Sequence, residues 1–406
     1  MNQHLCTSFG FLTAALIAST AFAAGYEPSI PFGGQTAGVA GIGTPYATGS
    51  QALFFNPAGL VGDSSAHDVS LNLSPGWGEF KGPAADVNRQ ETSQKKTLVP
   101  FSLMYAQTVN ENWGWGAGLY VSGGSYANYP SLDFSGYGIT EKLELKSDLT
   151  LLEFAAGLGY KVLPGLKVGA TWRVLMADAD LTVVSSTLRY MQMRDLKDTQ
   201  YNGFKLGAQY KLAGKTEFGL TYRSEVTFKA KGTVSGMDYG IATPIAKTDV
   251  TVGSLFPAAL TLGVAHELSE SWKILSEFVF TQYSRVTNLA VNETGKTGTP
   301  IELKWKDQSE IRLAGEYSGA ALPVRFGYIW SSQVTSSDYA SPTFTPPGAA
   351  QTLTLGTGKT LGLSGEQSMQ INAGFEYLWS QGSGTGTPAK YALHAYGLHF
   401  GVQYAF

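Results

Sequence analysis

The final sixteen residues, Tyr391–Phe406, most constrain the fold of this chain, because large apolar side chains alternate along them with small or polar ones. Counting back by twos from the last residue, one face carries Phe406, Tyr404, Val402, Phe400, Leu398 and Tyr396. The other face carries Ala405, Gln403, Gly401, His399, Gly397 and Ala395. Successive side chains of a strand point to opposite faces, so the pattern predicts a strand with one apolar and one polar face.

A chain that ends on such a strand, with a terminal aromatic residue, is typical of a bacterial outer-membrane β-barrel. In a soluble sandwich the same strand would leave aromatic side chains at an unprotected sheet edge. Charged residues make up only 15% of the chain, which is low for a soluble protein. The mean hydropathy of -0.04 fits a barrel, because alternating faces average to neutral. After the first two dozen residues, no window supplies the ~18 apolar residues of a membrane-spanning helix.

The N-terminus has the pattern of an export signal. Phe9–Ala18 is an apolar core and Ala21–Ala23 is a small-residue cleavage site, which together predict a signal peptide over residues 1–23. The alternative is a short buried helix. The single cysteine, Cys6, lies in this segment, so the mature chain has no disulfide, thiolate metal site or cysteine nucleophile. A net charge of -3 provides no basic stripe for nucleic acid.

From residue 66 to residue 406 the chain divides into about fourteen alternating segments, an even number as expected for a single-chain barrel. Tight turns alternate along the chain with long polar loops, which predicts short turns at the periplasmic end and long loops outside. The long loops are expected near 81–95, 125–145, 185–199, 232–253, 288–299, 336–349 and 381–390. The strands are expected at 66–80, 96–107, 112–124, 146–160, 165–184, 200–211, 215–231, 254–267, 271–287, 300–318, 321–335, 350–364, 367–380 and 391–406.

A charge facing lipid costs ~2–4 kcal/mol near the bilayer midplane, so the charged face of each strand is expected to point inward. Along 215–231 this reasoning places Phe218, Leu220, Tyr222, Val226 and Phe228 outward, and Glu217, Thr221, Arg223, Glu225, Thr227 and Lys229 inward. Aromatic residues near strand ends are expected in the two interfacial girdles, among them Trp113, Trp272, Tyr283 and Trp379.

Residues 24–65 differ from the rest of the chain. They are rich in Gly, Ala, Ser and Pro, show no strand alternation, and include the apolar stretch Phe54–Leu60. This stretch is too apolar for a linker and too irregular for a strand. We therefore expect a compact segment that another part of the protein buries. A barrel of fourteen strands is wide enough for water, and this segment could plug it.

Within that stretch, Asn56-Pro57-Ala58 resembles the NPA motif in the hatch of the FadL/TodX family of outer-membrane transporters, and Gly214–Ser224 is also similar to the family. The resemblance covers essentially the whole mature chain. It implies a fourteen-stranded barrel, a hatch inside it, a hydrophobic ligand site in the lumen, and a kinked third strand that opens a lateral gap into the bilayer. It also implies passive uptake of long-chain fatty acids or other hydrophobic compounds.

Several residues are candidates for these roles. Glycine inside a strand often marks a bend, so Gly123 and Gly124 are candidate kink positions. Phe54 and Phe55 either contact the ligand or wedge the hatch into the wall. Four arginines on predicted inward faces either pair a fatty-acid carboxylate or belong to an ion-pair network that holds the hatch: Arg173, Arg223, Arg312 and Arg325. Of these, Arg223 and Arg325 are the ligand-binding candidates. The loop 125–145 either forms an external capture patch or packs on itself, through Tyr126, Tyr129, Leu132, Phe134 and Tyr137.

Two other functions compete with transport of hydrophobic molecules: a general porin and an outer-membrane hydrolase. A hydrolase needs a histidine with a serine or acid beside it. The mature chain offers four histidines, each more typical of a wall residue: His67, His266, His394 and His399. We expect no enzyme activity, cofactor or metal. The expected partners of this monomer are a hydrophobic ligand, outer-membrane lipid and lipopolysaccharide, and the barrel assembly machinery, for which Phe406 would be the signal.

Overall fold

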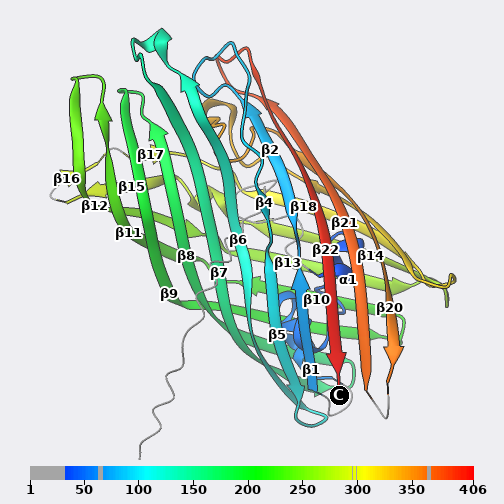
Figure 1. Ribbon diagram of the computed structural model, residues 1–406. Helices are drawn as coiled ribbons and strands as arrows, with labels where there is room; N and C mark the ends of the chain where they lie inside the picture. Colours follow the sequence, from blue (N-terminus) through cyan, green and yellow to red (C-terminus); the bar gives the residue numbers. More distant parts are fainter. Residues whose placement is uncertain (1–32, 63–66, 295, 299, 364–366) are drawn as a thin grey trace, which may run out of the picture.

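The computed structural model describes residues 33–62, 67–294, 296–298, 300–363 and 367–406. Within these residues one antiparallel sheet closes into a barrel of fourteen strands (Figure 1). The barrel closes where β1 (His67–Leu73) pairs with β22 (Lys390–Ala405), with Asp68 opposite Ala405 and Leu73 opposite Phe400. The predicted fold class is therefore confirmed. The predicted signal peptide, including Cys6, lies outside the described residues.

Ten of the fourteen wall strands are continuous and four consist of two pieces. The continuous strands are β5 (Phe101–Thr108), β6 (Trp113–Asp133), β7 (Lys142–Leu163), β8 (Leu166–Val184), β9 (Arg189–Leu212), β18 (Gln308–Tyr317), β19 (Val324–Ser331), β20 (Ala350–Gly362), β21 (Ser368–Ser383) and β22. The strands in two pieces are β1 with β2 (Gly76–Gly82), β10 (Thr216–Arg223) with β11 (Val226–Asp238), β12 (Thr243–Phe256) with β13 (Ala259–Glu267), and β14 (Trp272–Thr281) with β15 (Asn288–Glu293).

Short elements decorate the wall. They are the two-residue strands β3 (Glu91–Thr92), β4 (Thr97–Leu98), β16 (Lys296–Thr297) and β17 (Ile301–Glu302), and the 3-10 turns Ser135–Tyr137, Tyr283–Arg285 and Ser337–Tyr339. None of the helices in the described residues is long and apolar enough to cross a membrane.

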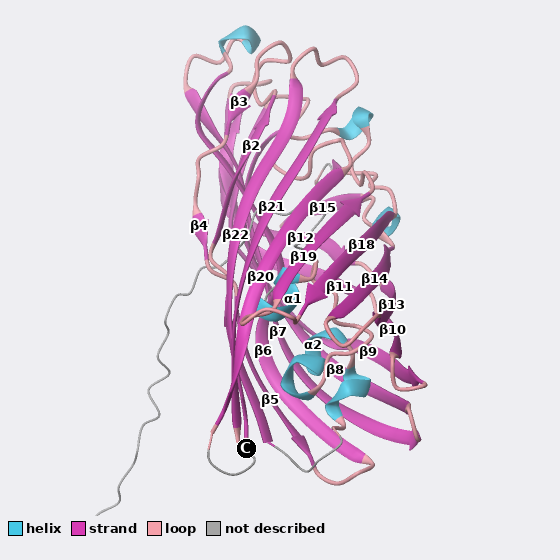
Figure 2. Cartoon of the chain, turned by 90° about the vertical axis from the view of Figure 1, so that its right-hand side faces the viewer, coloured by secondary structure: helices cyan, strands magenta, loops and turns pink. Residues whose placement is uncertain are grey.

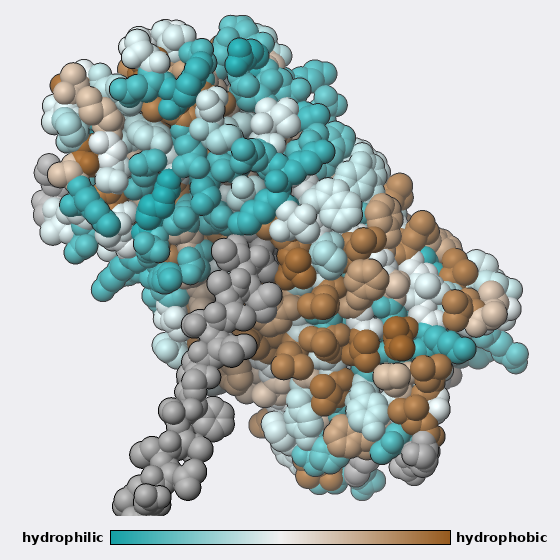
Figure 3. Space-filling view, viewed as in Figure 1, coloured by the Kyte–Doolittle hydropathy of each residue, from teal (hydrophilic) through white to brown (hydrophobic). Residues whose placement is uncertain are grey.

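The outer surface has two parts of opposite character (Figure 3). The lower part is an apolar band of exposed side chains such as Leu158, Leu262 and Phe400. The upper part is hydrophilic, and ion pairs link its strands: Lys146 of β7 with Asp180 of β8 at 3.2 Å, Lys197 of β9 with Asp178 of β8 at 3.4 Å, and Arg194 of β9 across β8 with Glu144 of β7 at 3.0 Å. The strands thus continue beyond the lipid-facing band into water.

This continuation corrects the predicted outer loops. Segments 125–145, 185–199 and 232–253 are mostly strand, because β6 extends to Asp133, β9 begins at Arg189, and only 239–242 separate β11 from β12. Above the apolar band the alternation reverses its sense, with apolar side chains inward and charged ones outward. A prediction that looks for strands with apolar outer faces therefore ends these strands before their true upper ends.

In segment 215–231, the predicted inward and outward orientations of the side chains are correct for residues before 224 and wrong for residues after it. Phe218, Leu220 and Tyr222 are exposed on the lipid side, whereas Val226 and Phe228 are buried in the interior. The two-residue interruption between β10 and β11 changes which alternate residues face inward. Thr227 and Lys229 consequently face outward.

Two of the predicted girdle residues pair with a neighbouring tyrosine on the outer face: Trp113 with Tyr160, centroids 4.5 Å apart, and Trp272 with Tyr317 at 4.9 Å. Trp379 is half-buried and stacks on Tyr377 at 5.4 Å. The prediction for Tyr283 is wrong. Its side chain is fully buried against Trp305, because the chain leaves the wall after β14 and turns inward.

Residues 33–62, which we call the hatch segment, lie inside the lower half of the barrel (Figure 2). They form α1 (Gly34–Gly38), α2 (Ala52–Phe55) and 3-10 turns at Gly49–Gln51 and Pro57–Leu60. Wall glycines allow the hatch segment to approach closely, because a Cβ on any of them would crowd a hatch atom. This glycine belt comprises Gly114, Gly159, Gly169, Gly207, Gly219, Gly263, Gly327, Gly356, Gly374 and Gly401.

The belt predicts that Gly219→Val loosens the hatch segment. A Cβ at Gly219 would overlap the Thr44 carbonyl, and such overpacking costs about 1–3 kcal/mol. We expect faster backbone hydrogen exchange across residues 43–60, measured by mass spectrometry. Gly362→Val is the matched control, because nothing lies within 4 Å of the Cβ position there. Equal exchange rates in the two variants would contradict the packing role of the belt.

Candidate functional site

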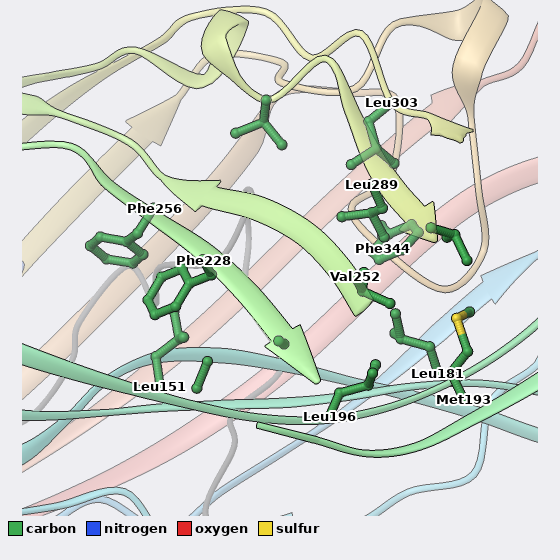
Figure 4. Close-up of a cluster of buried hydrophobic side chains, with 14 of the residues drawn as sticks. Leu151, Leu181, Met193, Leu196, Phe228, Val252, Phe256, Leu289, Leu303 and Phe344 are labelled. Atoms are coloured by element: carbon green, nitrogen blue, oxygen red, sulfur yellow. The ribbon is translucent and has the colours of Figure 1, made fainter. Parts of the chain in front are cut away.

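An apolar cavity lies inside the barrel, walled by β6–β9, β11 and β12. We call it the upper cavity. Aliphatic and aromatic side chains from these strands and from Leu289 and Phe344 converge on it (Figure 4). Its polar lining consists of three serines, and no charged side chain of the described residues lines it. The lining residues are Ser125, Ser147, Leu149, Leu151, Ala177, Ala179, Leu181, Leu196, Phe228, Ala230, Val252, Ser254, Leu255, Phe256, Leu289 and Phe344.

Irregularities in the wall bring these side chains inward. The break between β10 and β11 turns Phe228 and Ala230 toward the lumen. In β6, Val121 lies opposite Leu152 and Gly123 opposite Leu151, so Ser122 is an extra residue in a β-bulge. Gly124, the second candidate kink residue, follows the bulge with φ of 154°. The bulge lets Ser125 face the lumen above it, as Tyr120 does below it.

A second cavity, the lower cavity, lies between the hatch segment and the wall. Phe54 and Phe55 of the hatch segment line it, as does Ser122 of the bulge. The Lys205 ammonium group donates to the Phe54 carbonyl and lies 4.8 Å from the Phe54 ring centroid. Unlike the upper cavity, this one is lined by charged groups: Lys205, Arg223, Glu277 and Arg312.

Phe256 stands where the two cavities meet. Its side chain is fully buried and lines the upper cavity. The guanidinium carbon of Arg223, which lines the lower cavity, lies 4.4 Å from its ring centroid. The guanidinium carbon of Arg173 lies at 5.8 Å. Sequence reasoning did not select Phe256. The sequence signal was the dipeptide Phe256-Pro257, which is among the stretches similar to the FadL/TodX family and lies at a break in the wall strand.

Most of the predicted inward arginines are held in ion pairs. Arg173 donates to both carboxylate oxygens of Glu153 at 2.6 Å, and Tyr120 donates to the same carboxylate at 2.5 Å. Arg312 pairs with Glu310 at 2.6 Å. The guanidinium groups of Arg173 and Arg312 thus both have a carboxylate partner within the protein.

The two arginines that the sequence proposes as ligand-binding residues lie in different places. Arg223 lines the lower cavity and donates to the Pro257 carbonyl at 3.1 Å. Arg325 is buried beside Gly38 of the hatch segment, where it pairs with Glu316 and donates to Asn372 at 2.8 Å. Arg325 thus contacts the hatch segment, whereas Arg223 faces a cavity.

Asn56 of the Asn56-Pro57-Ala58 motif ties the hatch segment together and to the wall. Its amide nitrogen donates to the carbonyls of Thr44 and Ala208 at 2.9 Å each, and its side-chain oxygen accepts from the Ala58 amide at 3.2 Å. It therefore caps the 3-10 turn whose first residue is Pro57. Asn56 and Ala58 are fully buried.

The wall is incomplete beside the bulge. β6 pairs with β7 along nearly its whole length, but with β5 only over Gly114–Tyr120. Above Tyr120 this edge of β6 faces the segment 93–100, and the Gln94 amide donates to the Asn128 carbonyl at 2.7 Å. Among the described residues, nothing pairs with the edge between Val121 and Ala127.

The predicted outer capture patch is not exposed as a whole. Tyr129, Leu132 and Phe134 are buried in a cluster with Phe80 and Leu393, because they face inward on the upper part of β6 or just beyond it. Tyr137 is exposed and Tyr126 is half-buried.

One histidine has the neighbours of a hydrolytic triad. His399 Nδ1 lies 2.9 Å from Ser74 Oγ, and its Nε2 lies 3.5 Å from Glu376. Ser74 and His399 are each only 2% exposed, so a substrate has no access to them. The other three histidines each lie beside one hydroxyl group: His67 with Tyr105, His266 with Thr216 and His394 with Tyr377. No group of three or more metal-ligating side chains occurs among the described residues.

Residues 14–404 match the family model described as "Outer membrane protein transport protein (OMPP1/FadL/TodX)". The chain belongs to the FadL/TodX family. The resemblance predicted from the sequence is therefore confirmed. Members of this family are transport channels of the outer membrane, so the protein is an outer-membrane channel and not an enzyme.

Solved structures agree with this assignment in fold. A FadL homologue of Pseudomonas aeruginosa is 15% identical with a TM-score of 0.76, over 94% of this chain and 99% of that one. The toluene transporter TodX of Pseudomonas putida is 19% identical with a TM-score of 0.71, over 95% and 99%. The toluene transporter TbuX of Ralstonia pickettii is 19% identical with a TM-score of 0.69, over 93% and 98%. None of the curated proteins is significantly similar in sequence.

The contacts of Asn56 predict that Asn56→Ala detaches part of the hatch segment. It removes four hydrogen bonds, three of them to the carbonyls of Thr44, Ala208 and Leu220, at a cost of about 2–3 kcal/mol. We expect increased ion conductance in planar bilayers and faster hydrogen exchange in residues 44–60. Asn110→Ala, which alters only a periplasmic turn, is the control. If Asn56→Ala conducts like the control, Asn56 does not hold the hatch segment.

Proposed function

We propose that the protein takes up hydrophobic molecules, long-chain fatty acids or hydrocarbons, by passive diffusion from the cell surface. The upper cavity is the binding site in the lumen. The hatch segment gates the path, and the ligand leaves laterally into the bilayer. The apolar upper cavity beside an incomplete stretch of wall is the observation that carries this proposal.

The free energy of transfer favours such a path over an aqueous pore. Moving an apolar chain into water costs ~0.8 kcal/mol per CH₂ group. A ligand in the upper cavity contacts Leu, Val, Ala and Phe side chains and does not pay that cost. Such an apolar lining would not stabilise the polar solutes that a general porin conducts. The solved relatives named as toluene transporters are consistent with an apolar cargo.

The bulge in β6 supports a lateral exit. Ser122 lines the lower cavity and Ser125 the upper one, so both cavities reach the unpaired edge of β6. The bulge lies opposite Leu151 and Leu152 of β7, where the outer face changes from charged to apolar: Asp148 lies above and Phe154, on the same face, is exposed below. A ligand that passes here would enter lipid directly. Gly123 and Gly124 would give the strand its bend.

The hatch segment supports gating from below. Wall side chains hold its backbone: Asp68 accepts from the Ser50 amide at 2.8 Å, and Gln209 donates to the carbonyls of Thr44 and Ala47 at 3.2 and 3.1 Å. Phe54 and Phe55 face the lower cavity, so a ligand that reached it would touch the hatch segment. Movement coupled to that contact would open the path without an external energy source.

The remaining partners are part of the same proposal. Phe406 is 46% exposed and its backbone pairs with that of His67 at 2.9 Å, which closes the barrel. We propose that this residue is the signal for the barrel assembly machinery, that the protein is a monomer, and that lipid and lipopolysaccharide surround its apolar band.

Removal of the protein is expected to slow the uptake of hydrophobic carbon sources at limiting concentration, and therefore growth on them. The measurement is uptake of radiolabelled oleate and of toluene by cells with and without the gene. Complementation with the intact gene is the control. Unchanged uptake of every long-chain acid and hydrocarbon would refute the proposed function.

Deletion of Ser122 tests the lateral exit. The deletion removes the bulge. It preserves which side chains face inward before and after the bulge, because Val121 and Gly123 already lie opposite the consecutive residues Leu152 and Leu151 of β7. We expect uptake to fall to the level of cells that lack the gene. The matched control is deletion of Ser131, which removes the second irregularity of β6, between Tyr129 and Leu132. Equal uptake by the two deletion variants would exclude an exit at Ser122.

A further inference from the structure

We infer that Phe256 is a specificity-determining residue that separates an uncharged binding site above it from a cationic site below it. With this ring in place the upper cavity accepts neutral hydrophobic molecules and discriminates against carboxylates. This inference rests on the proposed function and narrows its ligand class.

The upper cavity has no partner for a negative charge. Its polar groups are serine hydroxyls, of which Ser125 and Ser147 lie 3.2 Å apart. Hydroxyl groups can bond an alcohol or an ether oxygen. A carboxylate that entered would lose its hydration and gain no cation in return, which is a large unfavourable change. The lining therefore favours hydrocarbons and weakly polar molecules.

The lower cavity has the opposite character. Three cations line it, Lys205, Arg223 and Arg312, with one carboxylate, Glu277. Arg312 lies 2.6 Å from Glu310 and 3.6 Å from Glu277, so its charge is balanced within the protein. Lys205 and Arg223 add positive charge on the side nearer Phe54 and Phe256. A ligand carboxylate would be stabilised there by charge-assisted hydrogen bonds.

Phe256 is fixed between these environments. Its ring centroid lies 4.4 Å from the guanidinium carbon of Arg223 and 5.8 Å from that of Arg173, and burial strengthens such cation–π contacts. The hydrogen bond from Arg223 to the Pro257 carbonyl holds the guanidinium group beside the residue that follows Phe256. The bidentate pair with Glu153 holds Arg173. The ring therefore cannot turn aside without losing both contacts.

An amphiphile needs both cavities at once, with its chain in the upper one and its carboxylate in the lower one. Phe256 lines the upper cavity and its ring contacts Arg223, which lines the lower one. A neutral molecule needs only the upper cavity. The discrimination thus comes from the partition and not from an absence of cations in the barrel.

The test compares 1-decanol with decanoate, which share a chain length and differ in charge. The full mature protein is reconstituted in lipid nanodiscs at pH 8, where decanoate is ionised, and binding is measured by isothermal titration calorimetry against empty nanodiscs. Wild-type protein is expected to bind 1-decanol at least about tenfold more tightly than decanoate, because a buried charge without a partner is costly.

Phe256→Ala should join the cavities and raise the affinity for decanoate at least about tenfold relative to 1-decanol, because the carboxylate then gains a charged partner. Phe228→Ala is the matched control. It removes the same ring from the upper cavity but opens no path to Arg223, so the preference for 1-decanol should persist. In a Phe256→Ala background, Arg223→Met should reverse the gain for decanoate.

Two results would overturn the inference: equal binding of the two ligands by the wild-type protein, or equal changes in the ratio for Phe256→Ala and Phe228→Ala. Heat-modifiable migration in gel electrophoresis checks that each barrel is folded. If Phe256→Ala fails to fold, Phe256→Leu is used in the same comparison. Wild-type binding of decanoate alone would refute the partition but preserve the transport proposal. If the wild-type protein binds neither ligand, both this inference and the proposed function are refuted.

Discussion

Backbone hydrogen bonding is the constraint on which this structure depends. At membrane depth every N–H and C=O group needs a partner within the protein, so a wall strand can be interrupted only where other groups replace the ladder. Two of the strand breaks satisfy this condition, whereas among the described residues the edge of β6 between Val121 and Ala127 is left without a backbone partner. At the break between β10 and β11, the Ser224 amide donates to the Phe204 carbonyl and the Ser224 hydroxyl accepts from the Phe204 amide, both at 2.9 Å. At the next break the Gln282 amide donates to the Ala258 carbonyl at 2.9 Å.

The interior changes character along the barrel. β7 and β8 run without a break and present one face to the lumen, which carries Glu153 and Arg173 below and apolar side chains such as Leu151 and Leu181 above. The break between β10 and β11 and the bulge in β6 bring Phe228, Ala230 and Ser125 onto the same cavity. The upper cavity is thus built from continuous and interrupted strands together, and Phe256 stands at one of the interruptions, directly before Pro257.

The sequence was sufficient for the barrel, its closing strand and the hatch motif, because each depends on local pattern. The alternation along Tyr391–Phe406 needs no knowledge of neighbours, and Asn56-Pro57-Ala58 carries its own cap. The orientation of Val226 and Phe228 could not be predicted, since two residues at 224–225 decide it and their pattern shows no break. Tyr283 was misplaced for a related reason. Its interfacial appearance is that of any tyrosine at a strand end, and only the inward turn after β14 buries it.

The upper cavity and the role of Phe256 depend on contacts between strands distant in sequence. Arg173, Arg223 and Phe256 come from three different wall strands, and their spacing along the chain does not show that they meet. The role of a charged residue also depends on what surrounds it in the interior. Arg223 and Arg325 have the same sequence signature of an inward arginine, yet one lines a cavity and the other contacts the hatch segment.

The glycine belt has a consequence for how the barrel forms and opens. Glycine weakens a strand, because it has more backbone freedom to lose and no side chain to pack. The lower wall gathers ten such positions around one internal segment, so its rigidity comes from contact with that segment. Wall and hatch segment are therefore one cooperative folding unit. Wholesale ejection of the hatch segment would soften the surrounding barrel, so we expect the proposed path to open by local rearrangement, such as the loosening of a single turn.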